Sequence, residues 1–235
     1  MNGDKMPAGA PKKFVLDSST IITISDNCLI RVMKNLAQKE NISFIIPQSV
    51  YTESVETPIR IRKYELNAIR IRDAVDEGYI RVQKSTPQLR ARLERLQSLA
   101  DNLCTFNGER MRLLQLGEME TLALMREINA DALGIDERTT RMLIEEPRNL
   151  LGFLRKRHEG KILLNDSALS EFAREYGNIK IVRSAELIAL AYEDGSFGQE
   201  LHTSKQALEA ALFAAKYGGC AVSADEIKSY MGQIR

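Results

Sequence analysis

The sequence predicts an α/β fold in which a mostly parallel central sheet is covered by helices on both faces and followed by C-terminal helices. Short apolar runs of strand length alternate with segments of helical periodicity along most of the 235 residues. Two of these runs, Lys13–Leu16 and Ala130–Ile135, are followed directly by an aspartate. Parallel neighbouring strands need helical crossovers, so this alternation favours a parallel sheet.

The first elements are expected after a leader. Residues 1–11 contain two glycines, two prolines and no apolar period, so we expect a disordered leader there. A single domain is expected over residues 12–200. The first strand should end at Asp17, and the hydroxyl residues Ser18–Thr20 suit the start of a helix. Further elements are expected as follows: a helix with the stripe Leu29, Val32, Met33, Leu36 and Ala37, a strand at Ser43–Pro47 and a helix at Gln48–Glu56.

A helical insertion is expected at about residues 58–115. It shows two helical patterns, Ile61–Glu77 and Pro87–Asn107, separated by the strand-like run Tyr79–Gln83. The first part is basic, with ten Lys or Arg and five acids over Pro58–Arg95. This excess is typical of a solvated helix face, and it also fits a face that contacts RNA phosphates. The candidate phosphate contacts are Arg70, Arg72, Arg90 and Arg92.

The stretch Leu116–Arg138 combines a helix with a strand and two candidate site acids. The apolar residues Leu122, Met125 and Ile128 recur at helical spacing, and a step of 100° per residue places Glu118 within roughly 80° of them. Glu118 should therefore begin the buried face, with Glu120 and Glu127 on the opposite, exposed face. Asp136 follows the apolar run at the carboxyl end of the expected strand, where open α/β sheets gather ligand-binding side chains.

The alternation continues to the end of the chain. Two capping-box patterns, Thr203–Gln206 and Ser223–Glu226, indicate two helices in a C-terminal extension over residues 201–235. Between Asp136 and this extension we expect helices opening at Glu137–Arg141 and at Ser167–Tyr176 and Ser184–Glu193, and strands at Lys161–Asn165 and Ile179–Arg183.

Composition excludes several classes of function. The longest apolar runs are far below the ~20 residues of a membrane span, and no signal sequence opens the chain, so we expect a cytoplasmic protein with no membrane contact. Cys28, Cys104 and Cys220 are distant and odd in number, which favours reduced thiols. His158 and His202 lie near no nucleophile motif, and nucleotide-binding glycine motifs are absent. A formal charge of +1 means that any nucleic-acid surface must be local.

Carboxylates are therefore the candidates for chemistry. The acids Asp17, Glu53, Glu118 and Asp136 come from four separate elements, near expected strand ends or helix starts. Clustered carboxylates repel unless a cation lies between them, so such a cluster is typical of a site for Mg²⁺ or Mn²⁺. One or two such ions would activate water and stabilise charge at a phosphodiester. Since the chain has 32 acids, solvated surface positions are the alternative interpretation.

Four motifs in order resemble the PIN-domain family of PIN-like ribonucleases from archaea and bacteria. They are Phe14–Thr20 (FVLDSST), Ile46–Glu53 (IPQSVYTE), Leu116–Leu124 (LGEMETLAL) and Ala130–Arg138 (ADALGIDER). The resemblance extends from Lys13 to about Gly195. It implies a three-layer α/β/α sandwich and a metal site formed by Asp17, Glu53, Glu118 and Asp136. Ser19 matches a small hydroxyl residue that binds metal through water or orients the first aspartate.

The resemblance also implies activity, cofactor and partners. Similar proteins cleave RNA with Mg²⁺ or Mn²⁺, some as toxins neutralised by a protein partner or antitoxin and others in RNA maturation or decay. Candidate partners of this chain are therefore RNA, a protein partner or antitoxin, and a second copy of the chain. Two positions depart from the family pattern. The third acid is Glu118 where many members have aspartate, and Glu137 stands where relatives often have a second aspartate.

Three functions are candidates for this chain. The first is a metal-dependent endoribonuclease that leaves a 3′-hydroxyl and a 5′-phosphate, with the four acids as ligands. The second is a non-catalytic scaffold or RNA-binding member of the same fold, which is distinguished by whether the carboxylates converge and bind metal. The third, a small-molecule phosphohydrolase, is disfavoured because Ser19 stands where a second aspartate would be needed.

Overall fold

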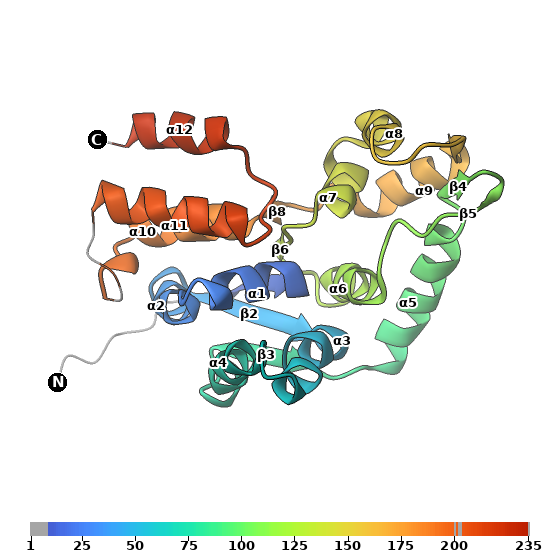
Figure 1. The fold of residues 1–235 in the computed structure, drawn as a ribbon. Helices are drawn as coiled ribbons and strands as arrows, with labels where there is room; N and C mark the ends of the chain where they lie inside the picture. The colour runs from blue at the N-terminus through green and yellow to red at the C-terminus, as the bar shows by residue number, and fades with distance from the viewer. Residues whose placement is uncertain (1–8, 200, 202–203, 235) are drawn as a thin grey trace.

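A parallel five-stranded sheet forms the centre of the protein, shown in Figure 1 as a computed structural model that describes residues 9–199, 201 and 204–234. The strand order is β3-β2-β1-β6-β8, and every neighbouring pair is parallel. The strands are β1 (Lys12–Leu16), β2 (Ile42–Pro47), β3 (Ile80–Gln83), β6 (Ala132–Gly134) and β8 (Ile181–Val182). The alternation of strands and helices therefore predicted the α/β class and the parallel sheet correctly.

Helices connect and cover these strands. In chain order they are α1 (Ser18–Asp26), α2 (Ile30–Glu40), α3 (Gln48–Tyr51), the π-helical turn η1 (Thr52–Glu56), the 3₁₀ turn η2 (Pro58–Arg60), α4 (Glu65–Asp76), α5 (Pro87–Ala100), α6 (Leu116–Glu127), α7 (Arg138–Glu145), α8 (Pro147–Arg155), α9 (Asp166–Tyr176), α10 (Ser184–Glu193), η3 (Phe197–Gln199), α11 (Lys205–Tyr217) and α12 (Ala224–Gln233). None of the helices in the described part of the chain is both long and apolar enough to cross a membrane.

Two hydrophobic clusters, one on each face of the sheet, give the three-layer arrangement. Along β1, Phe14 and Leu16 belong to the first cluster and Val15 to the second, as expected for side chains that alternate across a strand. Helices α1, α2, α4, α10 and α11 contribute to the first cluster, and α5 to α9 contribute to the second. The three-layer α/β/α architecture is thus confirmed.

A second, antiparallel sheet lies in the part of the protein built by α5, α8 and α9 (Figure 1). Its order is β5-β4-β7, with β4 at Cys104–Phe106, β5 at Glu109–Arg110 and β7 at Ile162–Leu164. The expectation that Lys161–Asn165 continues the parallel alternation is therefore wrong.

A β-hairpin formed by β4 and β5 explains why β7 joins an antiparallel sheet and not the central one. The helix expected over Pro87–Asn107 ends at Ala100. Asn107 and Gly108 then both have positive φ, 53° and 91°, in the two-residue turn between β4 and β5. An Asn-Gly turn of this kind is a strong hairpin signal. The hairpin offers β4 as an antiparallel partner for β7.

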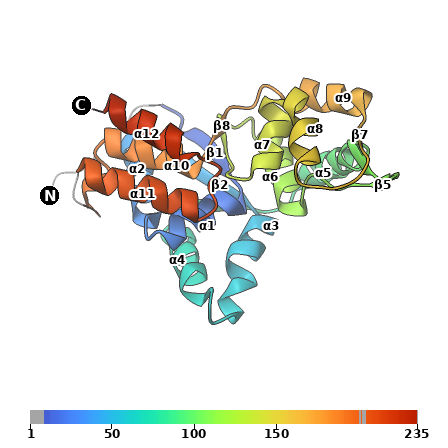
Figure 2. The same cartoon turned by 45° about the horizontal axis from the view of Figure 1, so that its top comes forward.

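The expected insertion and extension both share the central core. Residues 58–115 supply β3 of the central sheet as well as α4 on one face and α5 on the other. Figure 2 shows the segments α3–η1 and α4 projecting from the body as two arms of a V. Helices α11 and α12 pack on the first cluster, and the capping box at Ser223 and Glu226 is present. Thr203 and residues 1–8 of the expected leader lie outside the described residues; α11 is capped by Ser204.

Candidate active site

Asp17 stands at the carboxyl end of β1, where the chain turns into α1. Its Oδ2 atom accepts hydrogen bonds from the backbone N–H of Ser19 at 3.1 Å and from the Ser19 hydroxyl at 2.8 Å, so Asp17 caps α1. Its Oδ1 atom is buried and has no hydrogen-bond partner. Burial raises the pKa of this carboxyl; the Ser19 hydrogen bonds oppose the shift and the charge of Glu53 adds to it.

Glu53, in the π-helical turn η1, lies against the start of α6. A Cβ atom on Gly117 would lie only 2.8 and 2.9 Å from the two carboxylate oxygens of Glu53. Glycine at the start of α6 thus allows the Glu53 carboxylate to lie against the N-terminus of that helix. This close approach joins two motifs that are 64 residues apart in the sequence.

Glu118 is buried, as expected from its place on the apolar stripe of α6. Its Oε2 atom accepts the backbone N–H of Gln115 at 2.6 Å, which forms a capping box, and its Oε1 atom accepts the hydroxyl of Thr140 at 2.7 Å. Burial raises the pKa of Glu118 to about 7, and repulsion from Asp17 and Glu137 adds to the shift. The carboxyl therefore lies near both of these acids.

Glu120 is also buried, so its expected exposure was wrong. Its Oε2 atom accepts the backbone N–H of Ser49 at 3.0 Å in the first turn of α3. Glu127, on the same face of α6, forms an ion pair with Arg92 of α5 at 3.9 Å. Helices α3 and α5 cover the face of α6 that the helical wheel leaves to solvent, which periodicity along one helix cannot reveal.

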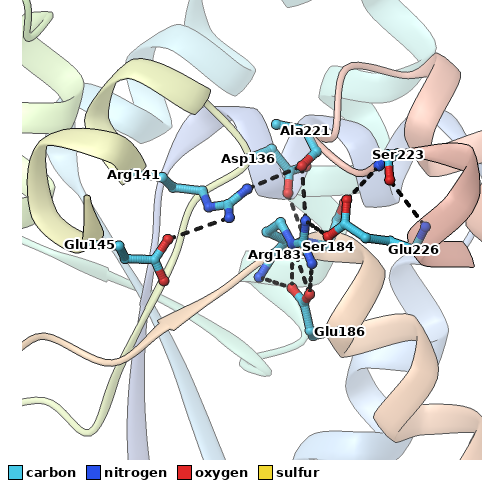
Figure 3. A network of polar contacts seen from close by, with 9 residues as sticks. All are labelled: Asp136, Arg141, Glu145, Arg183, Ser184, Glu186, Ala221, Ser223 and Glu226. Atoms are coloured by element: carbon cyan, nitrogen blue, oxygen red, sulfur yellow. Dashed lines mark hydrogen bonds and ion pairs between the residues drawn. The ribbon is translucent and has the colours of Figure 1, made fainter. Parts of the chain in front are cut away.

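Asp136 is buried at the end of β6 and forms its side-chain hydrogen bond with the start of α10. Its Oδ1 atom accepts the backbone N–H of Ser184 at 2.8 Å at the start of α10, as Figure 3 shows, and its Oδ2 atom is buried without a hydrogen-bond partner. The neighbouring thiol of Cys220 has its pKa raised to about 12 by burial and by the charge of Asp136. The backbone N–H of Asp136 donates to the Ser19 hydroxyl at 3.1 Å.

A groove of about 380 Å³ joins the remaining acids. Its acidic lining consists of Asp17, Glu53, Glu118 and Glu137, and no lysine or arginine is among its lining residues in the described chain. Glu137 also caps α7 by accepting the backbone N–H of Thr140 at 2.7 Å. The structure thus places Glu137, and not its neighbour Asp136, at the groove.

Part of the groove wall comes from the C-terminal helices. Gly218 and Gly219, between α11 and α12, line the groove. The carbonyl of Ala221 in the same turn accepts hydrogen bonds from Arg141 at 3.1 Å and from Arg183 at 2.9 Å (Figure 3). Arg183 also forms ion pairs with Glu186 and Glu226. Burial lowers the pKa of its guanidinium, but the hydrogen bonds and charges of these two glutamates outweigh burial and raise the pKa above its usual value. The sequence did not indicate that Gly218, Gly219, Arg141 or Arg183 contributes to the site, and the adjacent glycines were the only local signal.

The donor chemistry of the groove fits a hard divalent cation. All of its charged side chains are carboxylates, one buried oxygen of Asp17 lacks a partner, and the acids repel one another. Within the described residues, however, no three His, Cys, Asp or Glu side chains converge closely enough to enclose a metal ion. The exposed Glu53 side chain has the freedom to approach Asp17 further.

The four candidate RNA-binding arginines belong to two helices that cover opposite faces of the central sheet. Arg70 and Arg72 belong to α4, on the face of the first cluster, and Arg90 and Arg92 belong to α5, on the opposite face. Arg92 is engaged in ion pairs with Glu127 and with Glu175, the latter at 3.8 Å. Whether these arginines contact RNA phosphates stays a prediction.

Comparison with known proteins gives one match. A family model described as a PIN domain matches residues 13–147, more than half of the chain, including Asp17, Glu53, Glu118 and Glu137. No curated protein and no solved structure matches the chain significantly. The match covers β1 to the start of α8 and leaves the α9–α12 part outside it. With its parallel sheet and the acids at the carboxyl end of β1, the chain belongs to the PIN-domain family, whose fold is of the nuclease type.

Proposed function

We propose that the protein is a divalent-metal-dependent endoribonuclease. The observation that carries this proposal is the acidic groove, in which the Asp17, Glu53, Glu118 and Glu137 side chains gather from four elements, with no lysine or arginine among the described residues that line it. Such a set would hold Mg²⁺ or Mn²⁺, and the cation would supply the positive charge that hydrolysis of a phosphodiester needs. RNA is the proposed substrate, with products that carry a 3′-hydroxyl and a 5′-phosphate.

The protein's own residues orient these carboxylates. Ser19 holds one oxygen of Asp17 and leaves the other without a partner. Gln115 and Thr140 fix the Glu118 carboxylate through one hydrogen bond to each oxygen. Gly117 leaves room for Glu53. Asp17 and Glu118 are thus held by hydrogen bonds from neighbouring residues, which is the kind of preorganisation that a metal site requires.

Asp136 has a different part in this proposal from the one that the family pattern implies. Its carboxylate holds the start of α10, and its backbone N–H anchors the Ser19 hydroxyl. We therefore expect Asp136→Asn to retain most cleavage, since asparagine keeps the acceptor for Ser184, whereas Glu137→Gln lowers cleavage. The opposite order of effects would return Asp136 to the ligand set.

A cleavage assay tests the function directly. Purified protein is incubated with a 5′-labelled single-stranded RNA and Mn²⁺, and the products are resolved by size and end chemistry. Asp17→Asn should abolish cleavage, because it removes a ligand charge while it preserves shape. Glu94→Gln, at an exposed position of α5, is the matched acid-to-amide control and should cleave as wild type. Equal cleavage by Asp17→Asn would assign the activity to a contaminant.

Metal binding has a readout that does not depend on activity. Because metal would bind the folded state alone and relieve the repulsion between carboxylates, Mn²⁺ should raise the melting temperature of the wild type. The rise should be largely lost in Asp17→Asn and retained in Glu94→Gln. A melting temperature that does not respond to millimolar Mn²⁺ would contradict the metal site.

A non-catalytic RNA-binding or scaffold protein is the second candidate. The observation that favours it is that both oxygens of Glu118 already accept hydrogen bonds, one of them as a helix cap, and that no three acids converge in the described residues. This candidate predicts RNA binding without cleavage and no effect of Mn²⁺ on the melting temperature. The two assays above separate it from the enzyme.

A further inference from the structure

An exposed tyrosine ends helix α11 beside the acidic groove. Tyr217 has 79% of its surface exposed, more than any other large apolar or aromatic side chain in the described residues. Its ring stacks on Phe213 with centroids 6.3 Å apart and an interplanar angle of 26°. The ammonium group of Lys216 lies 4.6 Å from the centroid of the Tyr217 ring. The ring therefore packs against Phe213, the ammonium group of Lys216 lies over it, and most of its surface remains exposed.

This tyrosine adjoins the groove directly through the chain. The next two residues, Gly218 and Gly219, line the groove together with the carboxylates. Consecutive Cα atoms are about 3.8 Å apart, so the Tyr217 ring lies within roughly 10 Å of the groove wall. Gly219 has a φ of +118°, a conformation that favours glycine, and this allows the sharp turn out of α11.

The turn after Tyr217 is held in place. Ala221 is fixed by Arg141 and Arg183, and a Cβ atom on Gly218 would lie 3.2 Å from the carbonyl of Ala214 and 3.3 Å from the side chain of Asn27. The first hydrophobic cluster also anchors α11 through Leu212 and Ala215. The end of α11, which carries Tyr217, is thus anchored next to the groove wall.

We propose that Tyr217, together with Lys216, stacks a nucleobase of a single-stranded RNA whose phosphodiester lies at the acidic groove. This inference rests on the proposed function and specifies its substrate. Every base has a π-face, so an exposed ring binds unpaired bases with little sequence preference, and the lysine adds a charge for the neighbouring phosphate. Bases within a duplex are already stacked and are not available to the ring.

A second lysine–tyrosine pair provides a matched control. The ammonium group of Lys63 lies 5.1 Å from the centroid of the Tyr64 ring, and 45% of the Tyr64 surface is exposed. Tyr64 immediately precedes α4, in one arm of the V of Figure 2, and neither it nor its chain neighbours line the groove. The two sites share their chemistry and differ in their position relative to the carboxylates.

Binding assays test the proposal without requiring cleavage. Fluorescence anisotropy with a short labelled single-stranded RNA, in Ca²⁺ or without metal, should give about tenfold weaker binding for Tyr217→Ala, the scale of one lost base stack. Tyr217→Phe should bind within about twofold of wild type, and Tyr64→Ala should bind as wild type. Equal affinities for Tyr217→Ala and wild type would overturn the proposal, and so would equal losses in the Tyr217 and Tyr64 variants.

A fluorescent reporter separates stacking from a change in fold. The chain contains no tryptophan, so Tyr217→Trp places a single indole at the platform. Single-stranded RNA should quench its emission strongly and a duplex of the same sequence should not, whereas Tyr64→Trp should be unaffected by either. Quenching in a protein that never cleaves RNA would support the stacking site and refute the nuclease. RNA cleavage by the wild type without quenching of the indole in Tyr217→Trp would support the nuclease and refute the stacking site.

Discussion

The Glu118→Gln substitution tests how the groove is built, because its effect on stability should depend on pH. In the folded protein the pKa of Glu118 is raised from 4.5 to about 7, mainly by burial and also by repulsion from Asp17 and Glu137. A folded-state pKa above the unfolded value means that the folded protein holds the proton more tightly. The contribution of Glu118 to stability is therefore fully present below pH 4.5 and is lost as the pH rises to 7.

The size of this effect follows from the shift. One pKa unit corresponds to about 1.4 kcal/mol, so ionisation of Glu118 in the metal-free protein costs on the order of 3 kcal/mol at pH 8. Glutamine keeps the shape and an acceptor for the N–H of Gln115, but it carries no charge to bury. Glu118→Gln should therefore be more stable than wild type by up to about 3 kcal/mol at pH 8 and nearly equal to it at pH 4.5. For a chain of this size, about 3 kcal/mol corresponds to a rise in melting temperature of roughly 6–12 °C.

Thermal or urea unfolding followed by circular dichroism, in EDTA at pH 4.5 and pH 8, measures this difference. Glu120→Gln is the matched control on the same helix. It weakens a charge-assisted hydrogen bond to the N–H of Ser49, so it should lower stability at pH 8 by about 1 kcal/mol. If the stability difference between Glu118→Gln and wild type is the same at both pH values, ionisation of the buried Glu118 carboxyl does not determine the stability of the metal-free protein.

Two further predictions follow from the architecture. Gly117→Ala should displace the Glu53 carboxylate and lower kcat/KM for RNA about tenfold or more, since a misplaced group of the site is costly, while the melting temperature stays equal or rises. Gly152→Ala, inside α8, has a Cβ atom that would meet nothing within 4 Å, so it should leave kcat/KM unchanged and raise the melting temperature slightly. A normal kcat/KM in Gly117→Ala would show that the position of the Glu53 carboxylate does not matter for cleavage. Arg183→Ala removes one of the two arginines that donate hydrogen bonds to the carbonyl of Ala221. Amide hydrogen exchange should therefore accelerate in α12 and in the turn between α11 and α12, while β1 stays protected. An equal change in exchange along the whole chain would contradict a local role of Arg183.

Periodicity along the chain was sufficient to predict the central architecture. Apolar runs with helical crossovers predicted β1, β2, β3, β6 and β8 within about two residues, because strands buried between two helical layers are rich in apolar residues. The same reasoning placed Asp17 at a strand end and Glu118 on the buried face of α6. These features depend on local spacing, which the sequence carries directly.

Only the tertiary structure decided which acids share the groove. Asp136 and Glu137 are adjacent in the sequence. The carboxylate of Asp136 accepts a hydrogen bond from the N–H of Ser184 at the start of α10, whereas Glu137 lines the groove. Such a choice depends on the donors that surround the end of β6, which come from distant parts of the chain. Similarly, Glu120 is buried because α3 supplies a backbone N–H to it.

The C-terminal contribution to the groove was also beyond sequence reasoning. Gly218 lies 201 residues from Asp17 in the sequence, and the two line one groove because α11 packs on the first hydrophobic cluster and because Arg141 and Arg183 bind the turn that follows. Each of these contacts joins segments that no local pattern relates. Local periodicity therefore determined the sheet and two of the acids, whereas long-range packing and hydrogen bonding determined the walls of the groove and the direction in which each carboxylate points.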